Sequence, residues 1–393
     1  MKISASNSAI DIVSMKDTIK KYLPTDKRIY AIVIGIFSLV SLAYILKDKI
    51  FKSKPIVKEK TTQEKIADDF LEIKKTAAEM TACIKDIENI TEDEFIAMNQ
   101  LSSKLINDRK IVTLKHPENP KENEKAYCEN FRFKNIECPQ NTILPLRGAN
   151  LPIAGKNPTA EDRDDFLHAN EMNICGEKFI AGQYPVHHEL FWTTIKDRVN
   201  VIVDLTSKDE SKSTNTQFKS YAIDWAERKF PSGLAISCVA CIYPREEDHI
   251  FYKLVIKEDG LKKEYTRLHY NKWEDKKGVK DIAIFTKFVD YVNHISQISN
   301  GGLFIHCTDG VGRTGTLGTC LVLAALIDDD TIETKEELKT IMFESIVEGR
   351  LQRGHEYVQT LEQLQTIWKF ATGYLDARIA KIAKNVSQVT PKE

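Results

Sequence analysis

The sequence has almost no excess charge of either sign. Its 56 lysine and arginine residues are balanced by 57 aspartates and glutamates, so the formal net charge of the 393-residue chain is −1. Proteins that bind nucleic acids rely on an excess of positive charge to attract the phosphate backbone. The composition therefore argues against a general polyanion-binding protein, and we expect no nucleic-acid partner.

Glycine and proline are scarce as well, at 17 and 12 residues, and no internal repeat or low-complexity tract is present. These absences exclude a fibrous protein. Because 42% of the residues are hydrophobic and 29% are charged, the chain can bury a large core, which excludes wholesale disorder. A chain of this length is typical of one large domain with appendages.

The eight cysteines lack the spacing of a disulfide framework. This scatter favours reduced thiols in a cytosol-like compartment. Cys238 and Cys241 have the spacing of a metal or redox pair, but no second pair or histidine is near them in sequence, which favours buried cysteines of a strand. We expect neither a metal ion nor a cofactor.

Long hydrophobic runs are rare, with one exception at residues 29–46, which form the only charge-free stretch of this length. A span of roughly 17–25 residues crosses the hydrocarbon core of a bilayer, so we interpret the run as a single transmembrane helix. A buried core helix and a cleaved signal peptide are the alternatives. Within about twenty residues on each side, five lysines and arginines precede the run and six follow it, so the charge bias does not set the orientation.

The rest of the chain divides around this run. Residues 1–28 form a polar N-terminal segment, residues 47–87 a juxtamembrane linker with an amphipathic helix, residues 88–376 the main domain and residues 377–393 a basic tail. Between residues 66 and 87, apolar positions alternate in steps of four and three, which fits either a coiled-coil seam or a helix lying on its own domain. These positions are Ile66, Phe70, Ile73, Ala77, Met80, Ile84 and Ile87.

Within the main domain, helix and strand patterns mix, as in an α/β fold. Residues 199–205 are a short apolar run typical of a central strand. Asp259 and Gly260 separate two strand-like runs and predict a hairpin. Thr91 with Glu94 predicts the start of one helix, and Asp281 the start of another.

The strongest local signal is residues 302–316, in which an apolar strand leads into a glycine-bearing loop and then a helix. In such a loop, successive backbone N–H groups point inward, and the helix N-terminus adds positive potential, so the segment predicts a phosphate cradle. That field favours the thiolate form of Cys307, a nucleophile, while Arg313 suits bidentate binding of phosphate oxygens. His306 would orient the loop, and the hydroxyl of Thr314 would bond the sulfur and help the hydrolysis step. The substrate would be bound by the residues of the loop, Thr308, Asp309, Gly310, Val311 and Gly312.

The run from His306 through Cys307 and Arg313 to Thr316 resembles the signature of the protein tyrosine phosphatases. The resemblance covers roughly residues 90–375 and implies a twisted mixed β-sheet flanked by helices. It also implies hydrolysis of phosphotyrosine proteins through a cysteinyl-phosphate intermediate without a metal. Further segments resemble the family in chain order, namely 131–136, 165–170, 179–185, 191–192 and 206–210.

The resemblance also implies roles for residues outside the loop. Phe133 would stack on the substrate ring, and Glu210 would pair with Arg313. Trp273 and Asp275 would belong to a mobile loop in which Asp275 is the general acid. Gln359 would position the hydrolytic water, with Gln363 as the second amide.

Two residues depart from the family pattern. Glu274 replaces a proline in the mobile loop, which removes a φ constraint and adds a negative charge near the leaving group. Asp309 replaces a small neutral residue. The repulsion between a carboxylate and a neighbouring phosphate is on the order of a few kcal/mol at low effective dielectric. The same aspartate appears in catalytically silent relatives and in the myotubularin-type phosphoinositide phosphatases. A weakly active or inactive pseudophosphatase that binds phosphorylated partners and a phosphoinositide phosphatase therefore remain alternatives.

Because Cys307 must stay a free thiol, we expect the catalytic domain of a single-pass membrane protein to face a reducing cytosol. That cytosol would be the host's if the chain is a bacterial effector.

Overall fold

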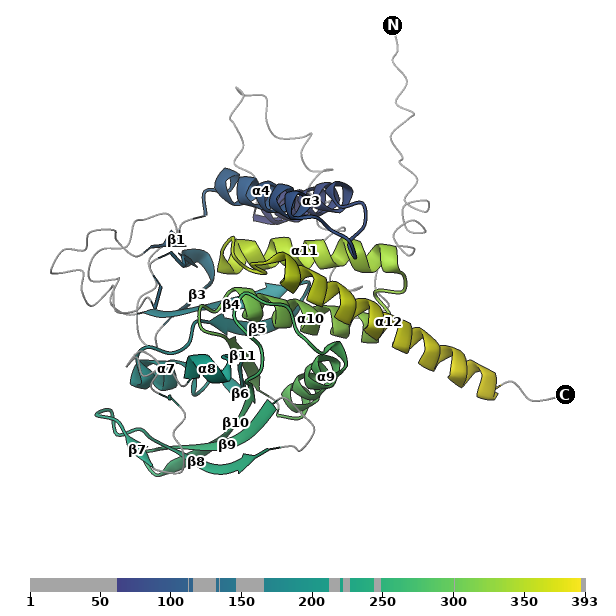
Figure 1. Cartoon of the computed structure of the whole chain (residues 1–393). Coiled ribbons are helices and arrows are strands. Elements are labelled where there is room, and N and C mark those ends of the chain that lie inside the picture. The colour runs from purple at the N-terminus through teal and green to yellow at the C-terminus, as the bar shows by residue number, and fades with distance from the viewer. Residues whose placement is uncertain are drawn as a thin grey trace, which may run out of the picture. The chain divides into compact units, whose positions relative to one another are not determined.

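The structure, a computed structural model, describes residues 62–111, 113–115, 132–133, 135–145, 166–211, 220–221, 227–243, 249–299 and 301–389 (Figure 1). Residues Ile66–Glu393 form one compact unit and Met1–Lys65 another. The predicted transmembrane run 29–46 and the polar segment 1–28 lie outside the described residues. Of the helices that are described, none is long and apolar enough to cross a membrane.

Most of the described strands form one nine-stranded mixed sheet in the order β3-β4-β5-β11-β6-β10-β9-β8-β7. Strand β11 runs parallel to β5 and to β6, and β6 runs parallel to β10. On either side of these four strands, β4 pairs with β5 and β9 pairs with β10 in the antiparallel direction. The strands of the sheet are β3 (Ile143–Pro145), β4 (Phe166–Ile174), β5 (Glu177–Gly182), β6 (Val199–Asp204), β7 (Arg228–Lys229), β8 (Ala235–Ile242), β9 (His249–Glu258), β10 (Leu261–Tyr270) and β11 (Gly302–His306). A separate two-stranded sheet pairs β1 (Thr113–Leu114) with β2 (Cys138–Pro139).

Helices flank the sheet on both sides (Figure 1). The described helices are α3 (Thr62–Cys83), α4 (Glu92–Asp108), the 3-10 helix η3 (Gln140–Thr142), α7 (His188–Ile195), α8 (Lys208–Ser211), α9 (Ile282–Ile298), α10 (Gly312–Asp328), α11 (Lys335–Arg353) and α12 (Leu361–Val389). This arrangement confirms the expected α/β fold with a mixed sheet flanked by helices.

The central strands send alternate side chains to opposite faces, as the period of two requires. On β6, Val201 and Val203 join the larger core with α9 to α12, whereas Ile202 joins the smaller core with α7. On β11, Ile305 and Phe304 divide between the same two cores. Strands buried on both faces read as continuous apolar runs, which is why residues 199–205 predicted a central strand correctly.

Local signals in the sequence also hold. Leu261 pairs with Glu258 across the β9–β10 hairpin, so Asp259 and Gly260 form its two-residue turn, with φ of 49° and 79°. Positive φ at both positions is what the tight hairpin turn requires. Thr91 caps α4 through a capping box with Glu94, and the side chain of Asp281 caps α9.

The amphipathic pattern before residue 88 belongs to the larger core. Ala77 and Met80 of α3 are fully buried there, which supports the alternative of a helix lying on its own domain. Helix α3 ends at Cys83, and Ile84 and Ile87 enter the core from the segment that follows. Phe70, which fits the same spacing, is 51% exposed.

Candidate active site

The predicted cradle lies where β11 ends and α10 begins, at the carboxyl ends of the parallel strands, the edge at which α/β sheets bind ligands. Cys307 heads the loop and is 1% exposed. The N–H of Gly310 donates to Sγ of Cys307 at 3.2 Å. Gly310 has a φ of 75°, and a Cβ there would lie 2.1 Å from the carbonyl oxygen of Gly182, so only glycine fits.

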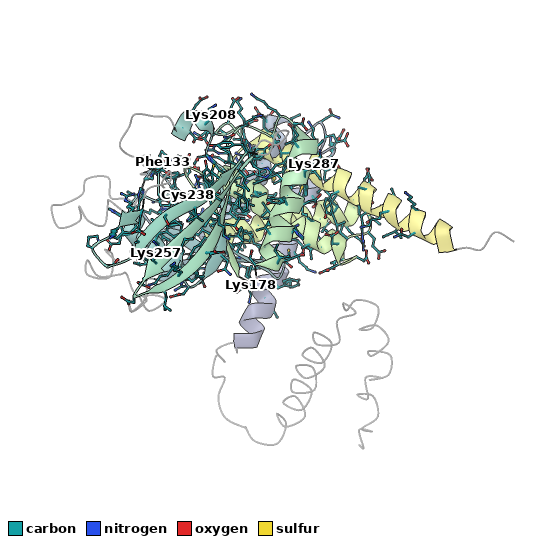
Figure 2. All side chains as sticks on the ribbon, turned by 90° about the horizontal axis from the view of Figure 1, so that it is seen from below. Phe133, Lys178, Lys208, Cys238, Lys257 and Lys287 are labelled. Carbon is teal, nitrogen blue, oxygen red and sulfur yellow. The ribbon has the colours of Figure 1, made fainter. Side chains whose placement is uncertain are left out.

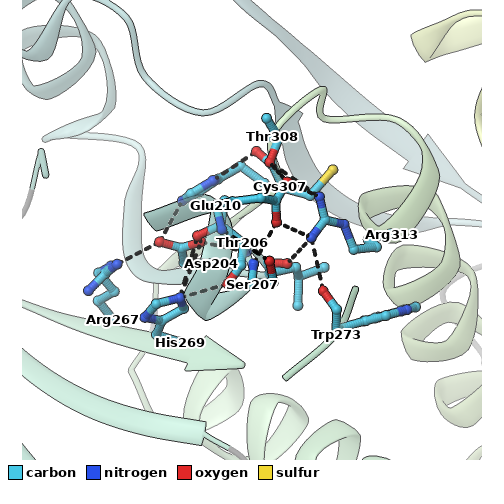
Figure 3. Close-up of polar contacts among 12 residues, drawn as sticks. Asp204, Thr206, Ser207, Glu210, Arg267, His269, Trp273, Cys307, Thr308 and Arg313 are labelled. Carbon is cyan, nitrogen blue, oxygen red and sulfur yellow. Dashed lines mark hydrogen bonds and ion pairs between the residues drawn. The ribbon is translucent and has the colours of Figure 1, made fainter. Parts of the chain in front are cut away.

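Arg313, in the first turn of α10, is fully buried (Figure 3). Its two Nη atoms each donate to one carboxylate oxygen of Glu210 at 2.7 Å. Nη1 also donates to the carbonyl oxygens of Leu205 at 2.9 Å and Trp273 at 3.0 Å. Burial opposes the charge of Arg313, but the bonds and charge of Glu210 outweigh it and raise the pKa of the guanidinium above its ordinary value.

Two donors beside the loop have no protein acceptor. Nε of Arg313 and Oγ1 of Thr314 are buried and make no hydrogen bond within the described part of the chain. Buried polar groups are almost always satisfied, and an orphaned guanidinium N–H is costly. The oxygens of a bound phosphate would supply acceptors of the kind that Arg313 lacks.

The loop from Trp273 to Gly278 closes against Arg313. Oδ1 of Asp275 accepts from Nη2 of Arg313 at 2.9 Å, while the Asp275 side chain stays 40% exposed. The indole of Trp273 is buried and donates from Nε1 to the carbonyl of Lys277 at 2.8 Å. The Asp275 carboxylate is therefore open to solvent while it is bonded to the guanidinium.

Glu274 does not share this position. Its carboxylate accepts from Nζ of Lys280 at the exposed surface, and that hydrogen bond lowers the pKa of Glu274. The negative charge expected near the leaving group is thus neutralised by a partner on the same loop.

Asp309 is half-buried in the cradle loop. Burial, and then the charge of Asp275, raises the pKa of Asp309 to about 6, against the opposing effect of Arg313 and Lys276. The departure from the family pattern therefore places in the loop a carboxyl group whose pKa is raised above its ordinary value.

Behind the cradle lies a buried polar network (Figure 3). Nδ1 of His306 lies 3.3 Å from the carbonyl oxygen of Cys307, and Nε2 lies 2.7 Å from the hydroxyl of Tyr221. Burial lowers the pKa of His306 to about 4, so the ring is neutral and can donate from one nitrogen and accept at the other. Tyr221 in turn accepts from Nε of Arg267, whose charge pairs with the fully buried Asp204.

Gln359 and Gln363 lie beside the end of the loop. A Cβ on Gly312 would lie 2.8 Å from Nε2 of Gln363 and 3.1 Å from Oε1 of Gln359. The amide of Gln359 donates from Nε2 to Glu356 at 2.6 Å, and its backbone N–H donates to Oε1 of Gln363 at 2.8 Å. Both side chains therefore lie against Gly312, the first residue of α10.

Phe133 is half-buried next to Arg132 (Figure 2). Arg132 donates from its backbone N–H to Oε1 of Gln183 at 3.1 Å and from Nη2 to the carbonyl of Pro185 at 3.2 Å. These bonds fix the Phe133 segment after the end of β5, whose last residue contacts the cradle loop. The structure thus assembles the predicted loop with its partners, namely Thr308, Glu210, Trp273, Asp275 and Arg313, and sets His306, Gln359 and Gln363 around it.

The sequence analysis missed two groups that hold the cradle. Arg353 of α11 is fully buried and donates from Nε to the carbonyl of Gly310 at 2.9 Å. The pair of Asp204 and Arg267 also went unnoticed. One signal could have predicted Arg353. The apolar residues Phe343 and Ile346 of α11 continue at helical spacing to Arg350 and then Arg353, so these arginines occupy positions where a buried residue is expected.

In the described residues, all seven cysteines are free thiols, and no cluster of three or more His, Cys, Asp or Glu could hold a metal ion. The site thus joins the edge of an α/β sheet to a buried arginine and two buried donors that make no hydrogen bond in the described residues.

Comparison with known proteins identifies the class further. Residues 127–372, more than half of the chain, match the family described as protein-tyrosine phosphatase. The chain belongs to this family of hydrolases.

Individual relatives are distant. The chain is 24% identical over 274 residues to a receptor-type tyrosine-protein phosphatase of Caenorhabditis elegans, covering 63% of this chain and 18% of that protein. It is 24% identical over 231 residues to tyrosine-protein phosphatase 3 of Schizosaccharomyces pombe, covering 56% of this chain and 72% of that protein. It is also 26% identical over 231 residues to the receptor-type tyrosine-protein phosphatase-like ida-1 of Caenorhabditis elegans, covering 56% of this chain and 28% of that protein. The match therefore spans only a minor part of both worm proteins.

Proposed function

We propose that the protein is a phosphotyrosine phosphatase that works through a cysteinyl-phosphate intermediate. The proposal rests on the loop that begins at the buried Cys307 and ends at Arg313. Nε of Arg313 is buried and makes no hydrogen bond within the described residues. The relatives are tyrosine-protein phosphatases or phosphatase-like proteins, which supports a phosphotyrosine protein as the substrate.

In the first step, the thiolate of Cys307 attacks phosphorus, and the bond from phosphorus to the tyrosyl oxygen breaks. The protonated carboxyl of Asp275 gives its proton to the leaving phenolate, since general acid help is typically worth about 10²–10⁴ in rate. Arg313 holds two phosphate oxygens once Asp275 has left Nη2, and Glu210 keeps the guanidinium in place. Phe133 would stack on the substrate ring.

In the second step, a water molecule attacks the phosphorus of the cysteinyl phosphate, and the bond from sulfur to phosphorus breaks. Gln359, with Gln363 beside it, positions the water, and the carboxylate of Asp275 accepts its proton. The hydroxyl of Thr314, which has no acceptor within the described residues, bonds the departing sulfur.

A pseudophosphatase is the second candidate, and one observation favours it. Asp309 is half-buried in the cradle loop and Asp275 already occupies Nη2 of Arg313, so two carboxyl groups compete with an incoming phosphate. The test is the release of inorganic phosphate from a phosphotyrosine peptide by the full chain in detergent. Peptide binding without phosphate release would replace the enzyme with a binding module.

A phosphoinositide substrate fits the site less well. Glu356 lies close enough to Asp309 to raise its pKa further, so carboxylates gather where a multiply phosphorylated headgroup would add negative charge. In the same assay, faster release from a phosphoinositide than from the phosphotyrosine peptide would contradict the proposed substrate class.

The charge of Asp309 should make the reaction depend on pH. Since its pKa is about 6, the group is mostly neutral at pH 5 and ionised at pH 7.5. We expect the ratio of kcat/KM of Asp309→Asn to that of the wild type to rise from near one at pH 5 to about ten at pH 7.5, where the wild type bears about 1.4 kcal/mol of repulsion. Using the ratio cancels the titration of the substrate and of the shared groups.

As a control, Asp376→Asn changes an exposed carboxylate that pairs with Lys335, so its ratio should stay near one at every pH. A flat ratio for Asp309→Asn as well would mean that the carboxyl group does not face the phosphate.

We also propose that residues 29–46 anchor the protein in a membrane as a single pass, with residues 88–376 as the catalytic domain and residues 377–393 as a basic tail. The charge-free run supports the anchor. The catalytic domain would face a reducing cytosol, because Cys307 has to remain a free thiol. The full chain should then stay in the membrane pellet after an alkaline carbonate wash, and its release into the supernatant would exclude the anchor.

A further inference from the structure

Arg350 of α11 links an N-terminal helix to the segment that carries Gln359. Nη1 donates to Oγ of Ser102 at 2.6 Å, and Nη2 donates to Oδ1 of Asn99 at 2.7 Å, both on α4. Nε donates to the carbonyl of Tyr357 at 3.1 Å, and Nη2 also donates to that of Val358 at 3.2 Å. Figure 1 shows α4 lying over α11, the arrangement that these bonds require.

The setting of Arg350 is costly. The side chain is 1% exposed, and no carboxylate is among its partners in the described chain. Burial alone lowers the pKa of Arg350 to about 10. Burying a cation beside neutral acceptors alone adds little to the stability of the fold. Arg350 is therefore better explained as a residue that fixes the geometry of the segments it joins.

The segment that Arg350 holds is strained. Val358 has a φ of 60°, in the left-handed region that a β-branched residue rarely adopts. Such residues persist only where their surroundings over-determine them. Val358 directly precedes Gln359, so its conformation sets the direction from which the glutamine side chain leaves the backbone.

We propose that Arg350 is a positioning residue that fixes Gln359 for the hydrolysis step, and that α4 holds Arg350 in place through Asn99 and Ser102. The proposal rests on the proposed function, in which Gln359 positions water. It predicts that loosening Arg350 slows the breakdown of the cysteinyl phosphate and leaves its formation unchanged.

The test uses the full chain in detergent with p-nitrophenyl phosphate. The variant Arg350→Lys retains a positive charge but cannot reach all four acceptors. We expect its steady-state kcat to fall about ten-fold, the scale of a modest misplacement of a catalytic group. The initial burst of nitrophenolate, which reports formation of the cysteinyl phosphate, should keep its rate. With glycerol present, a larger share of the phosphate should pass to glycerol, because Gln359 no longer positions water for the attack. The double variant Asn99→Ala/Ser102→Ala should change both quantities in the same direction.

Lys339→Met is the matched control. Lys339 is also a cation of α11 that donates to the N-terminal region, at the carbonyl of Ile84 at 2.7 Å, but it makes no bond to residues 357–359 in the described structure. Lys339→Met should leave the burst rate, the steady-state rate and the share of phosphate passed to glycerol as in the wild type. Equal loss of burst rate and steady-state rate in Arg350→Lys, with an unchanged glycerol share, would overturn the proposal.

A second measurement separates this inference from the proposed function. The backbone N–H of Gln359 donates to Oε1 of Gln363, so its hydrogen exchange reports on the local geometry. Exchange at Gln359 should be faster in Arg350→Lys and in the double variant than in Lys339→Met. If the wild type has no turnover at all, the proposed function fails, and unchanged exchange in all variants would refute the positioning role by itself.

Discussion

Cys307→Ser should lose phosphate release from phosphotyrosine peptides by about 10⁴-fold or more, the scale on which removing a covalent nucleophile acts. A serine hydroxyl stays protonated in the cradle, so it cannot attack phosphorus as a thiolate does. The domain should remain folded, because the exchange replaces only one sulfur atom by a smaller oxygen and preserves a side chain that can accept from Gly310. The variant should also still bind the peptide, since Arg313 is intact.

The measurement is steady-state phosphate release by the full chain, together with the thermal midpoint and peptide binding. Cys241→Ser is the matched control, because its thiol is half-buried on β8. It should retain wild-type activity. Turnover that survives in Cys307→Ser at an undiminished rate would refute the covalent mechanism.

Arg313→Lys should lower kcat/KM for the same peptide by about 10²–10³-fold, the cost of removing preorganised donors from a developing charge. Lysine presents a point charge and cannot reproduce the fork that meets both oxygens of Glu210. It would also give up the contacts with the carbonyls of Leu205 and Trp273, so the loop that carries Asp275 would lose one of its attachments.

Arg378→Lys supplies the control for this exchange, because Arg378 forms an exposed pair with Asp330 and lies far from the cradle in sequence. Its kcat/KM should match that of the wild type. If Arg313→Lys loses less than a few-fold, the phosphate must be held mainly by the backbone of the loop, and the guanidinium has no major part in binding.

Glu274 and Asp309 show where sequence reasoning about charge stops. Both residues introduce a negative charge into a family pattern that lacks it, and the sequence predicted that both charges would lie near the substrate. The structure separates them, because Lys280 neutralises Glu274 at the surface while burial and Asp275 raise the pKa of Asp309 to about 6. Solvent exposure and nearby charges decide a carboxyl group's ionisation, and neither can be read from neighbours in the chain.

The sequence by itself determined the parts of this protein that are built from adjacent residues. The strand, loop and helix of residues 302–316, the turn at Asp259 and Gly260, and the helix caps at Thr91 and Asp281 all follow from short-range rules for backbone angles and hydrogen bonds. Cys307 and Arg313 fall within one such segment, so the sequence alone could predict that they lie together.

Only the tertiary structure decided what surrounds them. Arg350 meets Ser102 across 248 positions of the chain, and Arg353 meets Gly310 across 43. No periodicity links residues so far apart, because their contact depends on how α11 packs against α4 and β4. The sequence of the cradle therefore indicates phosphate chemistry, whereas the contacts of Arg350 and Arg353 come from the packing of distant helices and strands.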